Sequence, residues 1–360
     1  MRYIPIGCVK EGMILGKTLY GEMGEILLRE GAIVHLSYVK KMKELGYFGI
    51  YIEDELSEGI KVQDVISEDL KMKTVKAVRN FMQSSSDEKL VKRSFSNIEN
   101  LIEDIVDEIL DNKDLVVNMV DLKVATNYTF YHSVNVSVLA LVLGVALKLD
   151  REELYLLGMT SLLHDMGKIF TPSEILDKPD KLTKEEYDEI KKHSQNGYRY
   201  VKEKLDVNTK VYVGIQQHHE RFDGTGYPNG ITGKKISLFG RVIAISDVFD
   251  ALVSDRPYRK GILPSEGMEY IMGSGGTLFD PDIVNVFSKK IAPYPIGTCV
   301  ILSNGYLGIV VKNYENYCLR PLVKIIKENE KCIEPYYINL LDSNYDVTIK
   351  SVADAMEMTS

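Results

Sequence analysis

The chain has 360 residues, enough for two or three domains, and it is 45% hydrophobic and 27% charged, an ordinary composition for a globular protein. Its formal net charge of -8 argues against a protein that binds nucleic acid polymers through a basic surface. A small anionic ligand is compatible with this charge, provided that a few lysines or arginines lie beside it.

No signal peptide is expected, because residues 1–20 include Arg2, Lys10, Glu11 and Lys17 and lack an apolar run of the required length. The most apolar stretch, residues 136–147, has about twelve residues, whereas about 20 are needed to cross a bilayer. The four cysteines form no C-x-x-C pair, which is typical of a reducing compartment. The sequence therefore predicts a cytoplasmic protein without a membrane partner.

Residues 1–56 predict a small α+β domain. Apolar runs at 26–28, 32–34 and 48–52 alternate with glycines and indicate strands, and a short helix is expected over 38–45.

Residues 57–114 predict a helical linker. Its aliphatic residues recur at helical spacing on one side: Ile98, Leu101, Ile102, Ile105, Val106, Ile109 and Leu110. This stripe predicts packing against the next domain or against a second copy of the chain, so one expectation is a homodimer through residues 90–115.

Residues 115–290 predict an almost wholly helical domain. Residues 134–149 are apolar nearly all round, which indicates a central helix. A capping box at 183–186 and the pair Asp280-Pro281 mark the starts of two further helices. Strand-like runs at 300–302, 308–311 and 322–326 predict a small β domain over 291–360, with a barrel as one option. The predicted fold class is mainly α.

Histidine and aspartate dominate the chemistry of the predicted helical domain. Five of the six histidines in the chain lie there: His132, His164, His193, His218 and His219. Asp165 follows one of them directly, and Asp247 and Asp250 project from one helix face because they lie three residues apart. Mixed imidazole and carboxylate ligands suit Fe, Mn or Zn better than Mg. So many ligands exceed the needs of one catalytic ion and fit two ions that together clamp a phosphoryl group.

Each of these residues has a simpler explanation when taken alone. A single histidine on an apolar helix, such as His132, is more often packed in a core. Asp247 and Asp250 alone would most simply be solvated or locally hydrogen-bonded helix residues. The joint pattern is hard to explain by core packing, because a His-Asp pair, single and paired histidines and an aspartate on an apolar helix occur together.

Three motifs resemble the HD-GYP family of metal-dependent phosphodiesterases. The string His164-Asp165-Met166-Gly167-Lys168 is similar to the HD signature of metal-dependent phosphohydrolases. Residues 218–228, H-H-E-R-F-D-G-T-G-Y-P, resemble the HD-GYP signature, and residues 247–252 with 255–259 resemble the closing motif of that family. The resemblance covers residues 115–290 and implies an all-helical catalytic domain there. Residues 1–60 and the tail resemble accessory domains of such enzymes only weakly.

The resemblance also implies roles for individual residues. It places metal ligands at His132, His164, Asp165, His193, His218, His219 and Asp247, with Asp165 as a bridging carboxylate between two divalent ions, iron or manganese. Lys168 would bind a phosphate oxygen and stabilise the charge that develops on it. Further substrate contacts are expected from Gly226, Tyr227, Asp250, Arg256 and Arg259. The plainer alternatives are that Lys168 is a cation at a helix end and that the two arginines only form ion pairs.

The implied reaction is attack of metal-bound hydroxide on a phosphodiester of a cyclic dinucleotide. For cyclic di-GMP the product is linear pGpG; further cleavage to GMP and use of another dinucleotide, such as cyclic GMP-AMP, stay open. The alternatives are an HD-type phosphohydrolase acting on another nucleotide, a catalytically weak cyclic-dinucleotide-binding module, and a purely structural helical protein. Some family members carry a glutamate four residues before the first histidine that helps to hold a third ion. Tyr128 occupies that position here, which predicts two ions unless Asp121 or Asp250 replaces the glutamate.

Overall fold

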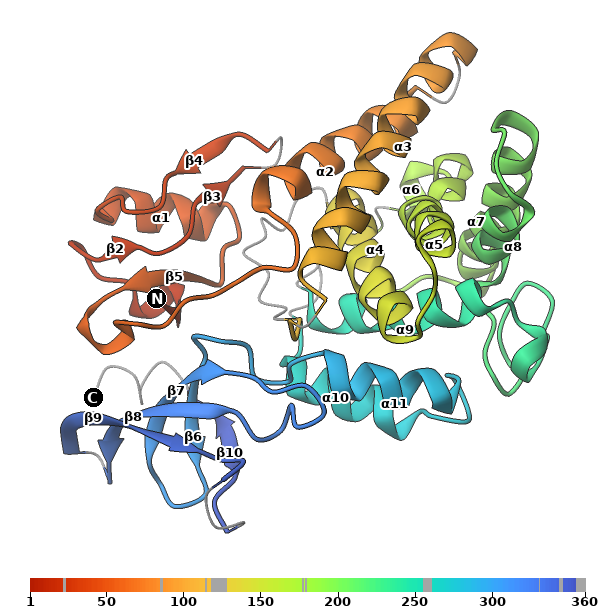
Figure 1. Cartoon of the computed structure of the whole chain (residues 1–360). Helices are drawn as coiled ribbons and strands as arrows, with labels where there is room; N and C mark the ends of the chain where they lie inside the picture. Colours follow the sequence, from red (N-terminus) through yellow and green to blue (C-terminus); the bar gives the residue numbers. More distant parts are fainter. Residues whose placement is uncertain are drawn as a thin grey trace.

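The computed structural model describes residues 1–21, 24–84, 87–113, 115–117, 128–176, 178, 180–254, 261–329, 331–342 and 346–353. A large helical body occupies one side of the molecule, and two small β-containing domains lie next to each other on the other side (Figure 1). The mainly α fold class is therefore confirmed, with an α+β domain at the N-terminal end and a β domain at the C-terminal end.

The N-terminal domain is α+β as predicted, and the runs at 26–28 and 48–52 form the strands β4 and β5. Strands β1 (Arg2–Pro5), β5 (Gly49–Glu53) and β2 (Ile14–Leu15) form an antiparallel sheet in that order, and β3 (Leu19–Tyr20) pairs with β4 (Ile26–Leu28). Two 3₁₀ turns, η1 (Ile6–Cys8) and η2 (Glu55–Ser57), flank the main sheet, and helix α1 spans Leu36–Glu44. The run 32–34 was wrongly expected to be a strand; it contributes a single bridge, between Ile14 and Ile33.

The predicted linker is part of the helical body. Helices α2 (Glu68–Gln83) and α3 (Glu88–Asp111) contact each other and pack against α4 (Tyr128–Ala146) and α5 (Arg151–Leu163). The aliphatic stripe of α3 is buried there, since Ile98, Ile102 and Ile105 are all 0% exposed. The stripe therefore packs within the chain. The apolar surface on which the expected homodimer was based is not available to a second copy. The other predicted domain boundaries stay predictions.

The remaining helices surround a common apolar core. They are α4 (Tyr128–Ala146), α5 (Arg151–Leu163), α6 (Ser173–Leu176), α7 (Lys184–Lys204), α8 (Thr209–Gln217), α9 (Leu238–Val253), α10 (Pro264–Gly273) and α11 (Pro281–Lys290), with 3₁₀ turns η3 (Met166–Phe170) and η4 (Gly233–Lys235). Both predicted helix starts are confirmed. Thr183 accepts from the Glu186 amide in a capping box, and Asp280 caps α11 with Pro281 in its first turn.

Helix α4 is the central helix that the sequence predicted. Its window Thr129–Ala146 is 18 residues long and apolar enough to cross a membrane by length and composition, so the apolar segment is longer than the sequence-based expectation. Within the helical body 78% of this window is buried. This burial is typical of a core helix, whose apolar surface is satisfied by neighbouring helices.

The C-terminal domain is a five-stranded antiparallel sheet in the order β10-β6-β7-β8-β9. Its strands are β6 (Cys299–Leu302), β7 (Leu307–Lys312), β8 (Leu322–Glu328), β9 (Lys331–Asn339) and β10 (Ile349–Val352). Within the described ranges no pairing joins β9 to β10, so the sheet is open rather than the barrel that was considered. This domain touches the N-terminal one directly, because the Tyr3 amide donates to the Gly297 carbonyl over 3.0 Å.

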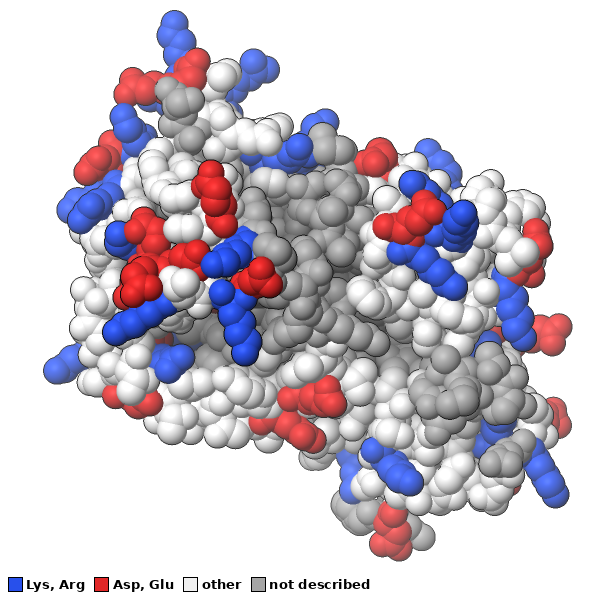
Figure 2. Space-filling view, turned by 180° about the vertical axis from the view of Figure 1, so that it is seen from behind, with Lys and Arg blue, Asp and Glu red and all other residues white. Residues whose placement is uncertain are grey.

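The charged side chains are mixed by sign over the surface. On the face seen from behind in Figure 2, Lys and Arg side chains alternate with Asp and Glu side chains, and the residues drawn in colour form no field of a single sign. Any site for an anion must therefore supply its cations locally.

Candidate metal centre

Five segments of the helical body bring the predicted ligands together. His132 lies on α4, His164 and Asp165 follow α5, His193 lies on α7, His218 and His219 follow α8, and Asp247 lies on α9. Three groups have ligand atoms within 4.8 Å of one another: His193 with His218 and His219; His132 with His164 and Asp247; and His164 with Asp165 and His218.

Asp165 lies between the histidines of this cluster. Its two oxygens are 3.5 Å from His193 Nε2 and 3.4 Å from His164 Nε2. Asp247 is the second carboxylate of the cluster, and its Oδ1 lies 3.0 Å from His132 Nε2. The structure therefore places one carboxylate in the middle of the imidazoles, where a bridging ligand would have to lie.

Most of the imidazoles are oriented by a hydrogen bond on the nitrogen that faces away from the centre. The Nδ1 atoms of His164, His193 and His218 donate to the carbonyl oxygens three residues earlier, over 2.7, 2.7 and 2.6 Å. A proton held on Nδ1 leaves the Nε2 lone pair free to face inward. Metal-binding histidines are held in this way, because the outer hydrogen bond fixes both tautomer and ring orientation.

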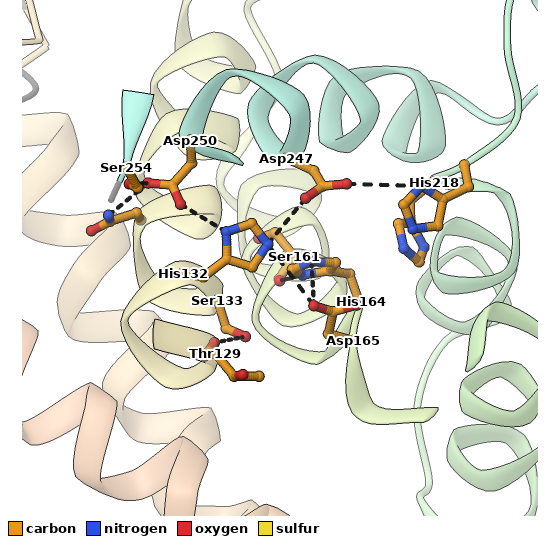
Figure 3. A network of polar contacts seen from close by, with 12 residues as sticks. Thr129, His132, Ser133, Ser161, His164, Asp165, His218, Asp247, Asp250 and Ser254 are labelled. Atoms are coloured by element: carbon orange, nitrogen blue, oxygen red, sulfur yellow. Dashed lines mark hydrogen bonds and ion pairs between the residues drawn. The ribbon is translucent and has the colours of Figure 1, made fainter. Parts of the chain in front are cut away.

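Asp250 holds the fourth imidazole in the same manner (Figure 3). His132 Nδ1 donates to Asp250 Oδ2 over 2.7 Å, and Asp250 Oδ1 accepts from Asn135 Nδ2 over 2.7 Å and from Ser254 Oγ over 3.2 Å. The Asp250 side chain is 0% exposed. The expected substrate contact at Asp250 stays a prediction; in this structure both of its oxygens are bonded to protein, so its observed role is to position His132.

The donor set fits a divalent metal. His164 Nε2 is buried and has no hydrogen-bond partner among the described residues. His193 Nε2 and His218 Nε2 face each other at 3.2 Å, although both nitrogens carry lone pairs when Nδ1 holds the proton. Burial lowers the pKa of both imidazoles, so neither relieves the conflict by taking up a proton at neutral pH. Cations held within these ligand groups would give the three nitrogens the partners that buried polar atoms require.

Lys168 reaches the cluster from η3. Its Nζ lies 2.5 Å from Asp165 Oδ2, and its side chain is 25% exposed whereas that of Asp165 is 3% exposed. Burial alone would raise the pKa of Asp165, but Lys168 and His164 hold that pKa well below its usual range. A cation therefore stands at the exposed edge of the cluster, beside an ionised carboxylate.

A close backbone crossing sets the position of His193. A Cβ at Gly167 would overlap the His193 carbonyl oxygen, and Gly197 on the next turn of α7 faces Gly167. Only glycine allows η3 to approach α7 this closely. The glycine of the His-Asp motif thus brings the turn that carries Asp165 and Lys168 against the helix that carries His193.

The loop after the paired histidines folds over His219. The Tyr227 amide donates to the His219 carbonyl over 3.1 Å, and the Tyr227 ring stacks on the His219 ring with centroids 4.7 Å apart. A Cβ at Gly226 would lie 2.5 Å from the His219 carbonyl oxygen, so this contact too requires glycine. Tyr227 and Gly226 therefore form one wall beside the metal centre.

Glu220 is a residue that the sequence reasoning missed. It is 3% exposed, and its carboxylate accepts from the amides of Asn229 over 2.7 Å and Ile231 over 3.2 Å, which ties the far side of this loop to the histidine pair. In the sequence, the position of Glu220 directly after two predicted ligands could have indicated a role in holding the loop. The same position is equally typical of a solvated turn, so the sequence alone could not distinguish a buried glutamate from an exposed one.

Several predicted residues lie outside the part of the chain that the structure describes. Arg256, Arg259 and Asp121 are among them, and so is the side chain of Tyr128. One cation that the sequence reasoning did not select is described near the centre. Lys191 Nζ lies 6.0 Å from the centroid of the Tyr227 ring.

Comparison with known proteins gives the same assignment as the motifs. The family model described as HD domain matches residues 103–283, half of the chain. A cyclic di-GMP phosphodiesterase of Pseudomonas aeruginosa is 38% identical over 225 residues, which cover 62% of this chain and 54% of that protein. A 3'3'-cGAMP-specific phosphodiesterase of Vibrio cholerae is 35% identical over 212 residues, or 59% of this chain and 43% of that protein.

The chain thus spans about half the length of the curated relatives that it matches. Among solved structures, an HD-GYP-related protein of Bdellovibrio bacteriovorus aligns over 79% of this chain and 97% of its own, with 16% identity and a TM-score of 0.48. With half of its length matched by the family model, the chain belongs to the HD domain family, in agreement with the motif resemblance.

Proposed function

We propose that this chain is a metal-dependent phosphodiesterase that hydrolyses cyclic di-GMP to linear pGpG. The observation that carries the proposal is the set of imidazoles that converge on Asp165 and Asp247 beside Lys168, with the buried His164 Nε2 lacking a hydrogen-bond partner among the described residues. The 38% identity to a cyclic di-GMP phosphodiesterase supports this substrate class.

Two divalent ions, iron or manganese, would be held by the seven predicted ligands. When bound, such ions act as Lewis acids and lower the pKa of water, which supplies a nucleophile at neutral pH. The choice between the two metals depends on availability as much as on ligands. Metal analysis of protein purified without oxygen should find two ions per chain, whereas three fully occupied sites would point to a replacement for the glutamate absent at position 128.

The residues around the centre would bind and orient the substrate. Lys168 is the cation closest to the cluster among the described residues; in the complex its ammonium would move from Asp165 to a phosphate oxygen and stabilise the charge that develops there. Tyr227, held against His219, would limit the approach to one side. Arg256 and Arg259 are proposed to supply further positive charge, which an acidic chain needs locally.

A second candidate substrate is 3',3'-cyclic GMP-AMP, because a phosphodiesterase specific for it is 35% identical to this chain. The proposed cytoplasmic location is supported by the four cysteines, none of which forms a disulfide in the described part of the chain, as in a reducing compartment.

The test is an assay of anaerobically purified, metal-analysed protein against cyclic di-GMP, 3',3'-cyclic GMP-AMP and nucleoside mono- and triphosphates. We expect metal-dependent formation of pGpG and no turnover by Asp165→Asn, because an amide is a poor bridging ligand. Near wild-type activity of that variant would contradict the two-metal assignment. Turnover of simple nucleotides alone would indicate the phosphohydrolase alternative, and binding without turnover at full metal content would indicate a binding module.

A further inference from the structure

Helix α7 carries a charged and aromatic group just before its ligand His193. The Tyr187 ring is exposed, and the side chains of Asp188 and Lys191 are 50% and 32% exposed. Lys191 Nζ lies 2.5 Å from Asp188 Oδ1 and 5.1 Å from the centroid of the Tyr187 ring. A cation, a carboxylate and an aromatic face are thus presented together to solvent.

This group adjoins the metal centre through a short series of contacts. Lys191 Nζ is 6.0 Å from the Tyr227 ring centroid, and Tyr227 stacks on His219 with centroids 4.7 Å apart. Tyr187, Asp188 and Lys191 therefore lie at the edge of the centre, one side chain beyond the wall that Tyr227 forms.

The chemistry at the metals uses none of these three residues. A helix surface often carries ion pairs at this spacing, and the same helix offers an instance one residue further on, where Lys192 Nζ lies 2.5 Å from Glu189 Oε2. Among the described contacts, neither Lys192 nor Glu189 touches an aromatic ring or the loop of Tyr227. The Asp188–Lys191 pair differs because Lys191 Nζ lies 5.1 Å from the Tyr187 ring centroid and 6.0 Å from the Tyr227 ring centroid, so the neighbouring pair is a matched control.

We propose that Tyr187, Asp188 and Lys191 form a guanine-binding subsite for the substrate. This inference rests on the proposed phosphodiesterase function and extends it to the identity of the base. A purine would stack on the exposed Tyr187 ring, as bases do on aromatic side chains. Asp188 would accept from the N1–H and 2-amino groups of guanine, and Lys191 would donate to O6.

Adenine presents the opposite pattern at the same edge. Its amino group takes the place of O6 and would face the Lys191 ammonium, and its unprotonated N1 would face the Asp188 carboxylate. A site built to form hydrogen bonds rejects an analogue that cannot form them, because its own polar groups then lose their partners. The subsite should therefore favour guanine over adenine by about 10- to 100-fold.

The experiment compares Asp188→Asn and Lys191→Met with Glu189→Gln and Lys192→Met in the full chain. For each, kcat/KM is measured for cyclic di-GMP and cyclic di-AMP, and the dissociation constants of both are measured by calorimetry in EDTA, which stops turnover. We expect the first two variants to raise KM more than they lower kcat and to reduce the guanine preference at least 10-fold, whereas the control pair keeps it.

Equal behaviour of the two pairs of variants, or a wild-type chain that does not distinguish the two dinucleotides in either measurement, would overturn the subsite. The failure of the proposed function gives a different result. If the chain hydrolyses no cyclic dinucleotide but still binds cyclic di-GMP selectively and loses that selectivity in Asp188→Asn, the subsite stands and the phosphodiesterase assignment does not.

Discussion

The ligand side chains of this protein are oriented by a second polar contact, on the side that faces away from the metal centre. His132 is the clearest example, because Asp247 lies 3.0 Å from one of its nitrogens and Asp250 lies 2.7 Å from the other. The sequence showed that Asp247 and Asp250 share a helix face. It could not show that α4 would place an imidazole between them, because that depends on how α4 packs against α9, and His132 and Asp250 are 118 residues apart in sequence.

Asp250→Asn should weaken metal binding without unfolding the chain. The amide must present an N–H group either to His132 or to Asn135, both of which donate to the carboxylate in the wild type. Loss of such an outer contact typically lowers metal affinity about 10- to 100-fold. Chelator competition measures this change. Ser254→Ala, which keeps the bond to His132, is the control and should change affinity much less; equal effects of the two variants would contradict the positioning role.

Lys168→Met should lower kcat by about 100-fold or more while leaving metal content close to that of the wild type. The reason is that Lys168 touches a carboxylate oxygen at the exposed edge and is not itself a ligand. Steady-state kinetics and metal analysis on the same preparation separate the two quantities. A collapse of metal occupancy would instead show that the lysine is needed to hold Asp165 in place.

At the scale of elements, periodicity located helices such as α3 and α4 and the strands β4 to β8, but it could not show which partner a face would pack against. The stripe on α3 was visible in the sequence, but the same stripe fits an intramolecular partner and a second copy equally well. The structure shows the intramolecular choice, with α3 against α4 and α5. Strands β1, β2, β3, β9 and β10 lie outside the predicted runs. Exposure explains why β9 was missed, because six of its nine residues are exposed and give no apolar run.

The close approach of η3 to α7 at Gly167 can be tested by adding one methyl group there. Gly167→Ala should lower activity strongly and destabilise the fold by about 1–3 kcal/mol, because the new Cβ would overlap the His193 carbonyl oxygen and force the two segments apart. Thermal unfolding and turnover are the measurements. Gly273→Ala is the matched control, since no atom lies within 4 Å of its Cβ position; similar losses in both variants would refute the packing argument.

At the scale of the whole molecule, the two accessory domains are packed against each other and against the helical body. The buried Tyr131 hydroxyl donates to the Gly21 carbonyl over 3.2 Å, which joins the N-terminal domain to α4 one residue before His132. None of this was predictable from composition or periodicity. Contacts between domains depend on shape complementarity, and isolated polar residues such as Tyr131 carry no periodic signal.

Without bound metal, the free energy of unfolding should fall on both the acid and the alkaline side of an optimum pH. Burial, followed by the charge of His193, lowers the pKa of His219 from 6.5 to about 3. Between those values the unfolded chain holds a proton at this position that the folded chain does not, so stability falls as pH drops below 6.5, by up to about 1.4 kcal/mol per pH unit for one such histidine. His193 and His218, whose pKa values burial also lowers, act in the same direction.

His132 acts in the opposite direction. Burial alone would lower its pKa, but hydrogen bonds to Asp247 and Asp250 raise that pKa to about 9. The contribution of His132 to stability is therefore complete below pH 6.5 and is lost as pH rises through 9.

The metal-free protein should therefore be most stable near pH 6.5. Urea unfolding in EDTA at pH 5.5, 6.5 and 8.5 checks this, with His219→Gln expected to flatten the acid side and His132→Gln the alkaline side. Bound metal keeps the ligands deprotonated and binds only the folded state, so it should raise stability most at the higher pH values. A metal-free stability that rises steadily from pH 5.5 to 8.5 would show that His132 is not protonated between its two carboxylates.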